Sequence, residues 1–217
     1  MLWELFDKSD FVKYPLGLFS ILALAIFIER LFTLARLKML EDKAFITLQL
    51  ALEKRDGSVI NDPQIAAAPV SQIMHTLLPM RGVSFEVLQQ AADVAVMIQR
   101  MRLRRYLSTL ATISSTAPFI GLFGTVLGVL EAFTAMGKAG SNVEGSAVAG
   151  NIGAALSATA VGLLVAIPSV IAYNFLLGQV QSTLLNIQTH VARLMPLLET
   201  PHGIISTSQA ARITQEV

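Results

Sequence analysis

The chain has 217 residues, of which 53% are hydrophobic and only 14% are charged, and its mean hydropathy is +0.61. This balance lies far from that of a soluble domain and indicates a membrane protein. The net charge of +1, without a basic run that contains interleaved aromatic residues, gives no sign of nucleic-acid binding. There is no cysteine, and His75, His190 and His202 lack ligand spacing, so we expect neither a metal site nor another cofactor.

Residues 1–13 form a short segment of mixed charge, which lacks the basic start and the cleavage site of a signal peptide. Residues 14–35 are apolar except for Glu29 and Arg30, and this length is sufficient for a first transmembrane helix. Adjacent side chains point to different sides of a helix and do not pair like residues four apart. We therefore interpret Glu29 and Arg30 as an interfacial charge couple that extends toward the headgroups, with a functional role as the alternative.

Residues 36–105 are polar and carry ten of the sixteen basic residues. By the positive-inside rule this region is cytoplasmic, so the N-terminus is expected in the periplasm and the C-terminus in the cytoplasm. A helical patch at residues 45–54 and chain breakers at residues 56–57, 61–63 and 79–82 predict short helices joined by loops. The region contains no phosphate-binding glycine loop, nucleophile elbow or spaced carboxylate pair, so the sequence gives no support for an enzyme.

The second span is expected to continue a cytoplasmic helix. Ser84 is placed to cap this helix, whose apolar residues recur at helical spacing without a breaker through Arg105. Residues 106–131 then form the second transmembrane helix, which predicts one unbroken rod. Pro118 is expected to kink the rod, and nearby hydroxyl groups are expected to satisfy the carbonyl groups that it frees. These hydroxyls belong to Thr112, Ser114, Ser115 and Thr116.

The third span is preceded by a short loop, residues 132–146, whose only basic residue is Lys138, and the loop is therefore expected to be periplasmic. Residues 147–177 form the third transmembrane helix, and residues 178–200 are expected to extend it into the cytoplasm. The apolar residues of this extension alternate at spacings of four and three: Val180, Leu184, Ile187, Val191, Leu194 and Leu198. The extension packs either on the second rod or a neighbouring subunit, or against a small cytoplasmic core. Residues 201–217 are predicted to be a flexible tail.

Small residues form a stripe on each of the two inner spans. Such stripes let helices approach closely in lipid, although packing within one subunit accounts for part of the pattern. The stripes comprise Gly121, Gly124 and Gly128 on the second span, and Gly150, Ala154, Ala158, Gly162 and Ala166 on the third.

Polar residues interrupt the third span at Asn151, Ser157, Thr159 and Ser169. Polar groups within a span usually face a protein interior or a hydrated path rather than lipid. Neither inner span has a titratable residue near its centre, and hydroxyl groups do not hold and release a proton at physiological pH. If the protein conducts protons, another chain must supply the carboxylate.

Two segments carry a family resemblance. APFIGLFGTVLGVLEAF at residues 117–133 and NIGAALSATAVGLLVAIPSVIAYN at residues 151–174, with the three-span topology, resemble the MotA/TolQ/ExbB proton-channel family, most closely ExbB and TolQ. The resemblance implies an all-α polytopic membrane protein with three transmembrane helices, of which the second and third are long and extend into the cytoplasm. It also implies a bacterial inner-membrane subunit of a motor driven by the proton-motive force.

The resemblance assigns functions to individual residues. Thr125 and Thr159 match the threonines that line the ion path in that family, and Ser157 and Ser115 are further candidates for this lining. Pro118 and Pro168 match its helix-shaping prolines, and Gly121, Gly124, Gly128 and Gly162 are expected to serve helix packing. The partners implied are further copies of the chain, forming a pentamer, an ExbD- or TolR-like single-span protein with an aspartate in its span, and a TonB- or TolA-like transducer.

One position departs from the family pattern. ExbB and TolQ members usually have a glutamate in the segment G-I-A-E-A-L, and the aligned residue here is Ala154. Glu131, near the external end of the second span, is either the residue through which the ion enters or an interfacial acid with no role in transport.

Three functions remain open at this point. The first is an energy-transducing channel subunit that powers TonB-dependent import or Tol-type envelope maintenance. The second is a nonconducting membrane scaffold, which Ala154 favours. The third is a specialised motility or stator motor of the same family, against which stand three spans instead of four and the lack of a charged torque-transmitting helix in residues 36–105.

Overall fold

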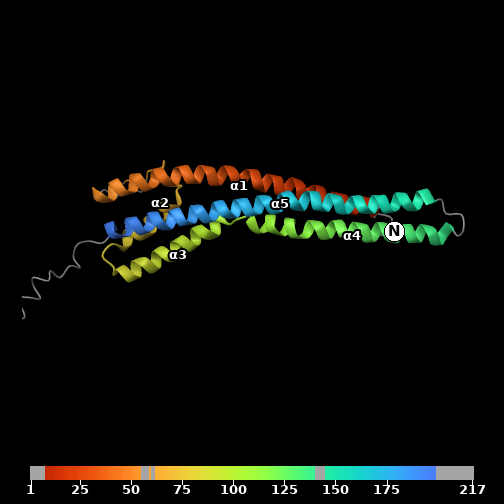
Figure 1. Cartoon of the computed structure of the whole chain (residues 1–217). Coiled ribbons are helices and arrows are strands. Elements are labelled where there is room, and N and C mark those ends of the chain that lie inside the picture. Colours follow the sequence, from red (N-terminus) through yellow and green to blue (C-terminus); the bar gives the residue numbers. More distant parts are fainter. Residues whose placement is uncertain (1–7, 55–58, 60–61, 140–144, 199–217) are drawn as a thin grey trace, which may run out of the picture. The chain divides into compact units, whose positions relative to one another are not determined.

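The computed structural model describes residues 8–54, 59, 62–139 and 145–198, and all regular secondary structure in these residues is helical. This confirms the predicted all-α fold (Figure 1). The predicted breaker at residues 56–57 and the tail at residues 201–217 lie outside the described residues. The helices are α1 (Lys8–Glu53), α2 (Pro69–Leu77), η2 (Leu78–Met80), α3 (Phe85–Leu103), α4 (Leu107–Ala139), α5 (Gly145–Leu194) and η4 (Met195–Leu198).

Three of these helices, α1, α4 and α5, are long and apolar enough to cross a membrane, which confirms the predicted number of spans. Within the most apolar stretch of Leu107–Gly137 only 17% of the residues are buried inside the chain. Most of the apolar surface of α4 is therefore left for lipid or for other chains.

The contacts within the chain divide it into two units. The first unit comprises Met1–Phe32 and Arg104–Gln179 and holds the most apolar segments. The second unit comprises Thr33–Leu103 and Val180–Val217 and holds most of the charged residues. Helices α1 and α5 contribute to both units, and each unit is described by itself below.

Helix α1 is longer than the sequence suggested. Its 46 residues would extend about 69 Å, whereas about 20 residues suffice to cross the hydrocarbon core. The predicted span at residues 14–35 and the predicted patch at residues 45–54 are joined because no glycine or proline separates them. The charged part of α1, from Arg36 onward, is a continuation of the helix beyond the predicted span.

Helix α5 also continues without a break for 50 residues, which agrees with the expected extension of the third span. All six apolar residues that recur at alternating spacings of four and three, from Val180 to Leu198, are buried. In the second unit they join a core to which α1 contributes Ala44 and Leu48 and α2 contributes Ile73. The extension therefore packs into a small core of the same chain, to which α3, the first part of the predicted rod, also contributes buried residues such as Leu88 and Val96. Packing of the extension on a neighbouring subunit stays a prediction.

The prediction of one unbroken rod from Ser84 is wrong at Arg104–Tyr106, although α3 begins at Phe85, directly after Ser84, as expected. Helix α3 ends at Leu103, and α4 begins at Leu107. Between them Tyr106 has φ +65°, a left-handed conformation that costs of order 1–3 kcal/mol for a residue with a side chain. Helical periodicity continues through this site in the sequence and therefore gives no sign of the break.

Two arginine side chains stack on the Tyr106 ring at this break. The guanidinium carbon of Arg30 lies 4.9 Å from the centre of the Tyr106 ring, and that of Arg105 lies 4.8 Å from it. Such contacts stabilise by about 0.5–2 kcal/mol each, which is enough to offset much of the backbone strain. We infer that the stacked arginines hold the Tyr106 conformation.

The interpretation of Glu29 and Arg30 as an interfacial charge couple that extends toward the headgroups is corrected by the burial of Arg30. Arg30 is buried, with 7% of its surface exposed, and its Nε lies 2.8 Å from a carboxylate oxygen of Glu29. The long side chains bend around the helix and meet, although their Cβ atoms point in different directions. Arg30 is thus a packed residue of the first unit rather than one that extends to the headgroups.

Turns separate the short helices of the second unit. The predicted breaker at residues 79–82 is confirmed, because η2 ends at Met80 and Gly82 follows with φ +91°. Helix α2 begins at Pro69, whose missing N–H is not needed in the first helical turn. On α2, Gln72 accepts hydrogen bonds from Gln99 and Arg102 of α3, which ties the two helices together.

Candidate ion path

Helices α4 and α5 pack against each other in the first unit as an antiparallel pair, seen side by side in Figure 1. The contact is closest at Gly121 and Gly162. A Cβ atom added to Gly162 would lie 2.8 Å from the Ala117 carbonyl oxygen and 3.0 Å from the Gly121 Cα. A Cβ atom added to Gly121 would lie 2.9 Å from the Ala158 carbonyl oxygen. Only glycine at both positions allows the two backbones to come this close.

The contact continues toward the end of α4. A Cβ atom on Gly128 would lie 2.6 Å from the Cβ of Ala155, and one on Gly124 would lie 2.6 Å from the Cβ of Ala158. Gly150, by contrast, has no atom within 4 Å of an added Cβ. The stripe on α5 therefore packs against α4 over its central part, and Gly150 lies outside this contact.

Thr159 forms a hydrogen bond between the two helices. Its hydroxyl donates to the Gly121 carbonyl oxygen at 3.0 Å, and the side chain is half-buried. The bond exists because glycine at position 121 leaves its carbonyl accessible from α5. It fixes the hydroxyl hydrogen toward the protein, so that the oxygen lone pairs are the part of Thr159 that remains available.

The other three candidate hydroxyls donate to carbonyl oxygens of their own helix. Thr125 donates to Leu122 at 2.6 Å, Ser157 donates to Ala154 at 2.7 Å, and Ser115 donates to Thr112 at 3.0 Å. These short-range bonds are common for serine and threonine in membrane helices. All four candidates thus present hydrogen-bond acceptors rather than donors to their surroundings.

Helix geometry places these four hydroxyls on different faces of α4 and α5. Thr125 lies four residues, about one turn, after Gly121, where Thr159 makes its bond. Ser157 and Thr159 are two positions apart, about 200° around α5, so they point to different sides. Ser115 lies six residues before Gly121, about 120° away around α4. Thr125 therefore lies about one turn along α4 from the carbonyl group that Thr159 contacts, whereas Ser157 and Ser115 lie on other faces of their helices.

The prolines lie inside the helices as expected, Pro118 in α4 and Pro168 in α5. The hydroxyls before Pro118 do bond to backbone carbonyls, but to those of Ser108, Ala111 and Thr112. The carbonyl that Pro118 leaves without its helical donor belongs to residue 114. The expected repair is therefore wrong for these hydroxyls, because the carbonyl groups that they contact lie two to six residues before residue 114.

A small cavity with a mainly apolar wall lies along the α4–α5 contact, on the side of Gly121 that leads to the end of α4. Its volume is about 30 Å³, which is enough for a single water molecule. Glu131, Asn151 and Lys13 bring polar groups to its wall, and Ala154 lines it as well. The remaining lining residues are small or apolar: Val12, Gly124, Leu127, Gly128, Ala155 and Ala158.

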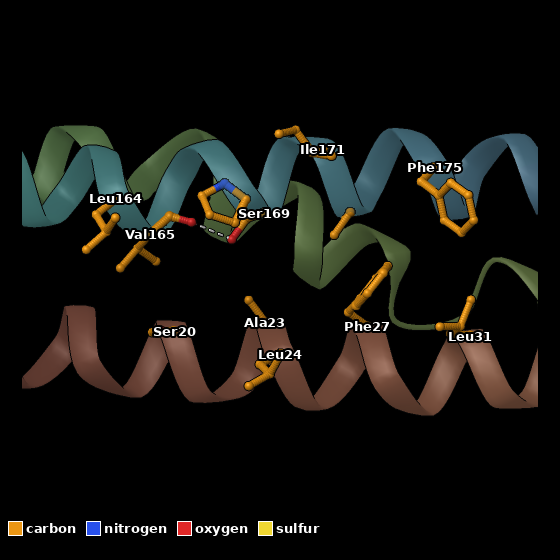
Figure 2. Close-up of a pocket in the computed structure, with 12 residues that line it drawn as sticks. Ser20, Ala23, Leu24, Phe27, Leu31, Leu164, Val165, Ser169, Ile171 and Phe175 are labelled. Atoms are coloured by element: carbon orange, nitrogen blue, oxygen red, sulfur yellow. Dashed lines mark hydrogen bonds between the residues drawn. The ribbon is translucent and has the colours of Figure 1, made fainter.

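A larger cavity of about 650 Å³ lies between α1 and α5 in the first unit, as Figure 2 shows. Its walls are apolar side chains such as Phe27 and Phe175, whose ring centres are 6.4 Å apart in an edge-to-face arrangement. The Ser169 hydroxyl, also in the wall, donates to the Val165 carbonyl oxygen at 2.7 Å and offers no free donor to the cavity. This cavity suits apolar contact rather than ion passage.

The sequence profile of the MotA/TolQ/ExbB proton channel family matches residues 61–189, more than half of the chain. The chain belongs to this family. The match contains α4 and most of α5, so the contact at Gly121 and Gly162 lies inside the region that defines the MotA/TolQ/ExbB proton channel family. It confirms the resemblance that the two apolar segments carry.

Several relatives bear the name biopolymer transport protein ExbB. One from Neisseria gonorrhoeae is 57% identical over 81 residues, which cover 37% of this chain and 36% of the relative. One from Xanthomonas campestris pv. campestris (strain B100) is 46% identical over 90 residues, covering 42% and 35%. One from Aquifex aeolicus (strain VF5) is 46% identical over 84 residues, covering 39% and 56%. The matched segment thus spans between about a third and a little over half of these relatives.

Proposed function

We propose that this protein is an inner-membrane subunit of an ExbB-like motor that is driven by the proton-motive force. In this proposal the chain forms a proton channel with an ExbD- or TolR-like single-span partner, and the work reaches a TonB- or TolA-like transducer. The N-terminus faces the periplasm, and the second unit faces the cytoplasm. TonB-dependent import is the process best supported, because the relatives described above carry the name ExbB.

The observation that carries this proposal is the chemistry around the Thr159–Gly121 hydrogen bond. Thr125 lies about one turn along α4 from the Gly121 carbonyl group to which Thr159 donates, and the hydroxyl hydrogens of both threonines are taken by carbonyl oxygens. Their lone pairs can accept a hydrogen bond from a protonated carboxyl group or from a hydronium ion. A partner aspartate that carries a proton past these positions would find acceptors on this chain and no competing acid.

Assembly with other chains is supported by the surface that α4 and α5 leave exposed. Large apolar side chains such as Phe119, Phe123 and Leu164 are exposed, and so are many of their neighbours in the spans. The central small residues of the two stripes, Gly121, Gly124, Gly128 and Gly162, are already used for the contact inside the chain. The exposed apolar faces are therefore the surfaces that we assign to neighbouring subunits of a pentamer, to the partner span and to lipid.

Glu131 is the residue that we propose as the point where protons enter. Glu131 lines the small cavity of about 30 Å³ together with Lys13 and Asn151, and that cavity is large enough for a water molecule. Ala154 lines the same cavity from α5, so the position at which the family pattern has a glutamate borders the space that Glu131 also lines from α4. An acid supplied from α4 would replace the one missing from α5.

A nonconducting scaffold is the second candidate, and Ala154 is the observation that favours it. The two functions differ in what a strain that lacks the protein would lose. For a motor subunit, deletion should abolish TonB-dependent uptake, and the wild-type chain should restore it together with its single-span partner.

The decisive variant in this experiment is a partner whose span aspartate is changed to asparagine. A motor predicts that uptake is lost while the complex still forms, as judged by copurification. Uptake that persists with this partner at wild-type level would favour the scaffold.

A further inference from the structure

A carboxyl group lies in the apolar core of the second unit. Glu41 is on the buried stripe of α1, which continues through Ala44 and Leu48, and only 2% of its surface is exposed. It lies six residues beyond the predicted end of the first span, in a stretch that also carries Asp42 and Lys43. With the first span at residues 14–35, as the sequence predicts, Glu41 lies outside the membrane but within a protein interior, where an ionised carboxylate is costly.

The Glu41 side chain contacts two other helices of this unit. One carboxylate oxygen, Oε2, accepts a hydrogen bond from the backbone N–H of Val70 at 3.2 Å, near the start of α2. The other oxygen, Oε1, faces Nδ1 of His190 on α5 at 3.6 Å. The carboxyl group thus links α1, α2 and α5.

His190 is held in place for this contact. Its ring stacks on that of Phe45, with ring centres 4.2 Å apart and an angle of 13° between the planes. Its side chain is 14% exposed. Both Glu41 Oε1 and His190 Nδ1 are buried atoms without a hydrogen-bond partner, so one proton between them would satisfy both once the two atoms move from 3.6 Å to hydrogen-bond distance.

The number of protons on this pair decides its charge. With one proton on the carboxyl group, Glu41 donates to His190 Nδ1, and the pair is neutral. Without that proton, a negative charge remains in the core, because the imidazole is neutral in either tautomer. Burial favours the neutral pair over the charged one.

We propose that Glu41 and His190 form a proton-binding site in the second unit, and that a proton held between Glu41 Oε1 and His190 Nδ1 closes α1, the start of α2 and α5 around a neutral core. The proton is taken up from water and is returned to water. This site goes beyond the proposed channel function, because it uses none of the candidate residues of the ion path.

The charged and titratable surroundings of the pair support binding close to neutral pH. Burial raises the pKa of Glu41 from 4.5 to about 7; the Val70 N–H opposes this rise, and Asp42 on α1 adds to it. Burial lowers the pKa of His190, with Asp42 opposing and Arg193 on α5 adding to the effect. From α2 the pair receives the Val70 N–H, and the titratable His75 lies in the last turn of that helix. The proton of the pair therefore belongs on the carboxyl group.

Infrared spectroscopy of the full chain in lipid nanodiscs tests this site directly, because a protonated carboxyl group has its own carbonyl band. Glu41→Gln is the informative variant, since a glutamine amide can accept from Val70 and donate to His190 without a charge. The infrared spectrum of the wild type minus that of Glu41→Gln should show the band of a protonated carboxyl group at about pH 6, and this band should be lost by about pH 8.5. Glu86→Gln, which changes an exposed acid in the first turn of α3, is the matched control and should show no such band.

Amide hydrogen exchange at Val70 provides the second readout. Relative to Glu41→Gln, the opening of this amide in the wild type should become about tenfold more favourable between about pH 6 and about pH 8.5. The absence of the carboxyl band in the wild-type difference spectrum would overturn the proposal. A Glu41→Gln protein that fails to fold at every pH would overturn it as well, because the uncharged analogue should reproduce the protonated state.

Discussion

The Thr159 hydroxyl on α5 donates a hydrogen bond to the Gly121 carbonyl oxygen on α4, at 3.0 Å. A threonine that was expected only to line an ion path therefore also joins two membrane helices. The two roles are compatible, because the hydrogen is used for the contact while the oxygen keeps its lone pairs. An experiment can distinguish the two roles, because loss of the hydrogen bond lowers the stability of the protein, whereas loss of the acceptor oxygen lowers conduction.

Replacement of Thr159 by alanine should weaken both properties. Hydrogen bonds between membrane helices contribute on average about 0.6 kcal/mol and at most about 1.7 kcal/mol, so Thr159→Ala should insert normally with a slightly lower denaturation midpoint. Transport-coupled function should fall, whereas Thr159→Ser, which keeps the hydroxyl, should retain most of it. Normal uptake by Thr159→Ala at wild-type expression would remove Thr159 from the ion path.

Thr125→Val removes a hydroxyl group from the proposed ion path without removing a contact between α4 and α5. The Thr125 hydroxyl bonds only within α4, to the Leu122 carbonyl oxygen, so its loss should leave the contact between α4 and α5 unchanged. Valine has a similar shape, and the denaturation midpoint should stay close to that of the wild type. Uptake should nevertheless decrease, and Thr125→Ser is the matched control. A Thr125→Val protein with undiminished uptake would show that this hydroxyl has no part in conduction.

Gly162→Ala tests the close approach of the two helices. The added Cβ would lie 2.8 Å from the Ala117 carbonyl oxygen, so the helices must separate at a cost of about 1–3 kcal/mol. Gly162→Leu should be more severe and should disrupt assembly, as seen by native gel electrophoresis. Gly150→Ala is the control on the same helix, because an added Cβ there meets no atom within 4 Å. Equal midpoints and equal oligomer sizes for the position 162 and position 150 variants would contradict the observed contact.

The buried pair in the second unit predicts a pH dependence of stability. The pKa of Glu41 is raised from 4.5 to about 7, so between these values the folded state keeps a proton that the unfolded chain has released. Stability from this group is therefore complete below about pH 4.5 and is lost as the pH rises to about 7. His190 has a lowered pKa and acts in the opposite direction below 6.5, so the loss due to Glu41 is clearest above 6.5.

Glu41→Gln should remove this loss. Above pH 7 the variant should be more stable than the wild type by roughly 3 kcal/mol, because it carries no buried charge, and the two should converge in acid. Thermal denaturation in one detergent at a series of pH values measures the difference. A constant offset between the two proteins at all pH values would contradict the assignment of the titration to Glu41.

Much of the first unit could be predicted because membrane spans have a strong sequence signal. Uncharged stretches fixed the number of spans, and the spacing of small residues indicated the faces around Gly121 and Gly162 that pack together. The hydrogen bond of Thr159 could not be predicted in the same way, because it depends on which carbonyl oxygen the close approach exposes.

The break at Tyr106 shows a different limit. Periodicity and the absence of glycine and proline favoured a continuous helix, and the observed left-handed residue is held by contacts with Arg30 and Arg105. Arg30 is 76 positions away in the sequence, so local propensity contains no information about this contact. Tertiary stacking overrides helix propensity at this site.

Glu41 and His190 are both polar residues on stripes of the sequence that are otherwise apolar. Glu41 follows Leu34 and precedes Leu48 by seven residues each, so a single acid stands on an otherwise apolar heptad stripe. His190 lies three residues after Ile187 and four before Leu194, at the edge of the corresponding stripe on α5. A search for charged residues on apolar stripes would have found both, but only the structure shows that they face each other.

The central claim is that this chain supplies the shape and the hydroxyl groups of a proton path while a partner supplies the carboxylate. Proton flux into lipid vesicles, measured with an entrapped pH indicator under an imposed membrane potential, tests it most directly. We predict flux for vesicles that contain the chain with its single-span partner, and none for the chain alone or with a partner whose span aspartate is changed to asparagine. Equal flux through the chain alone and through the complex would contradict this account.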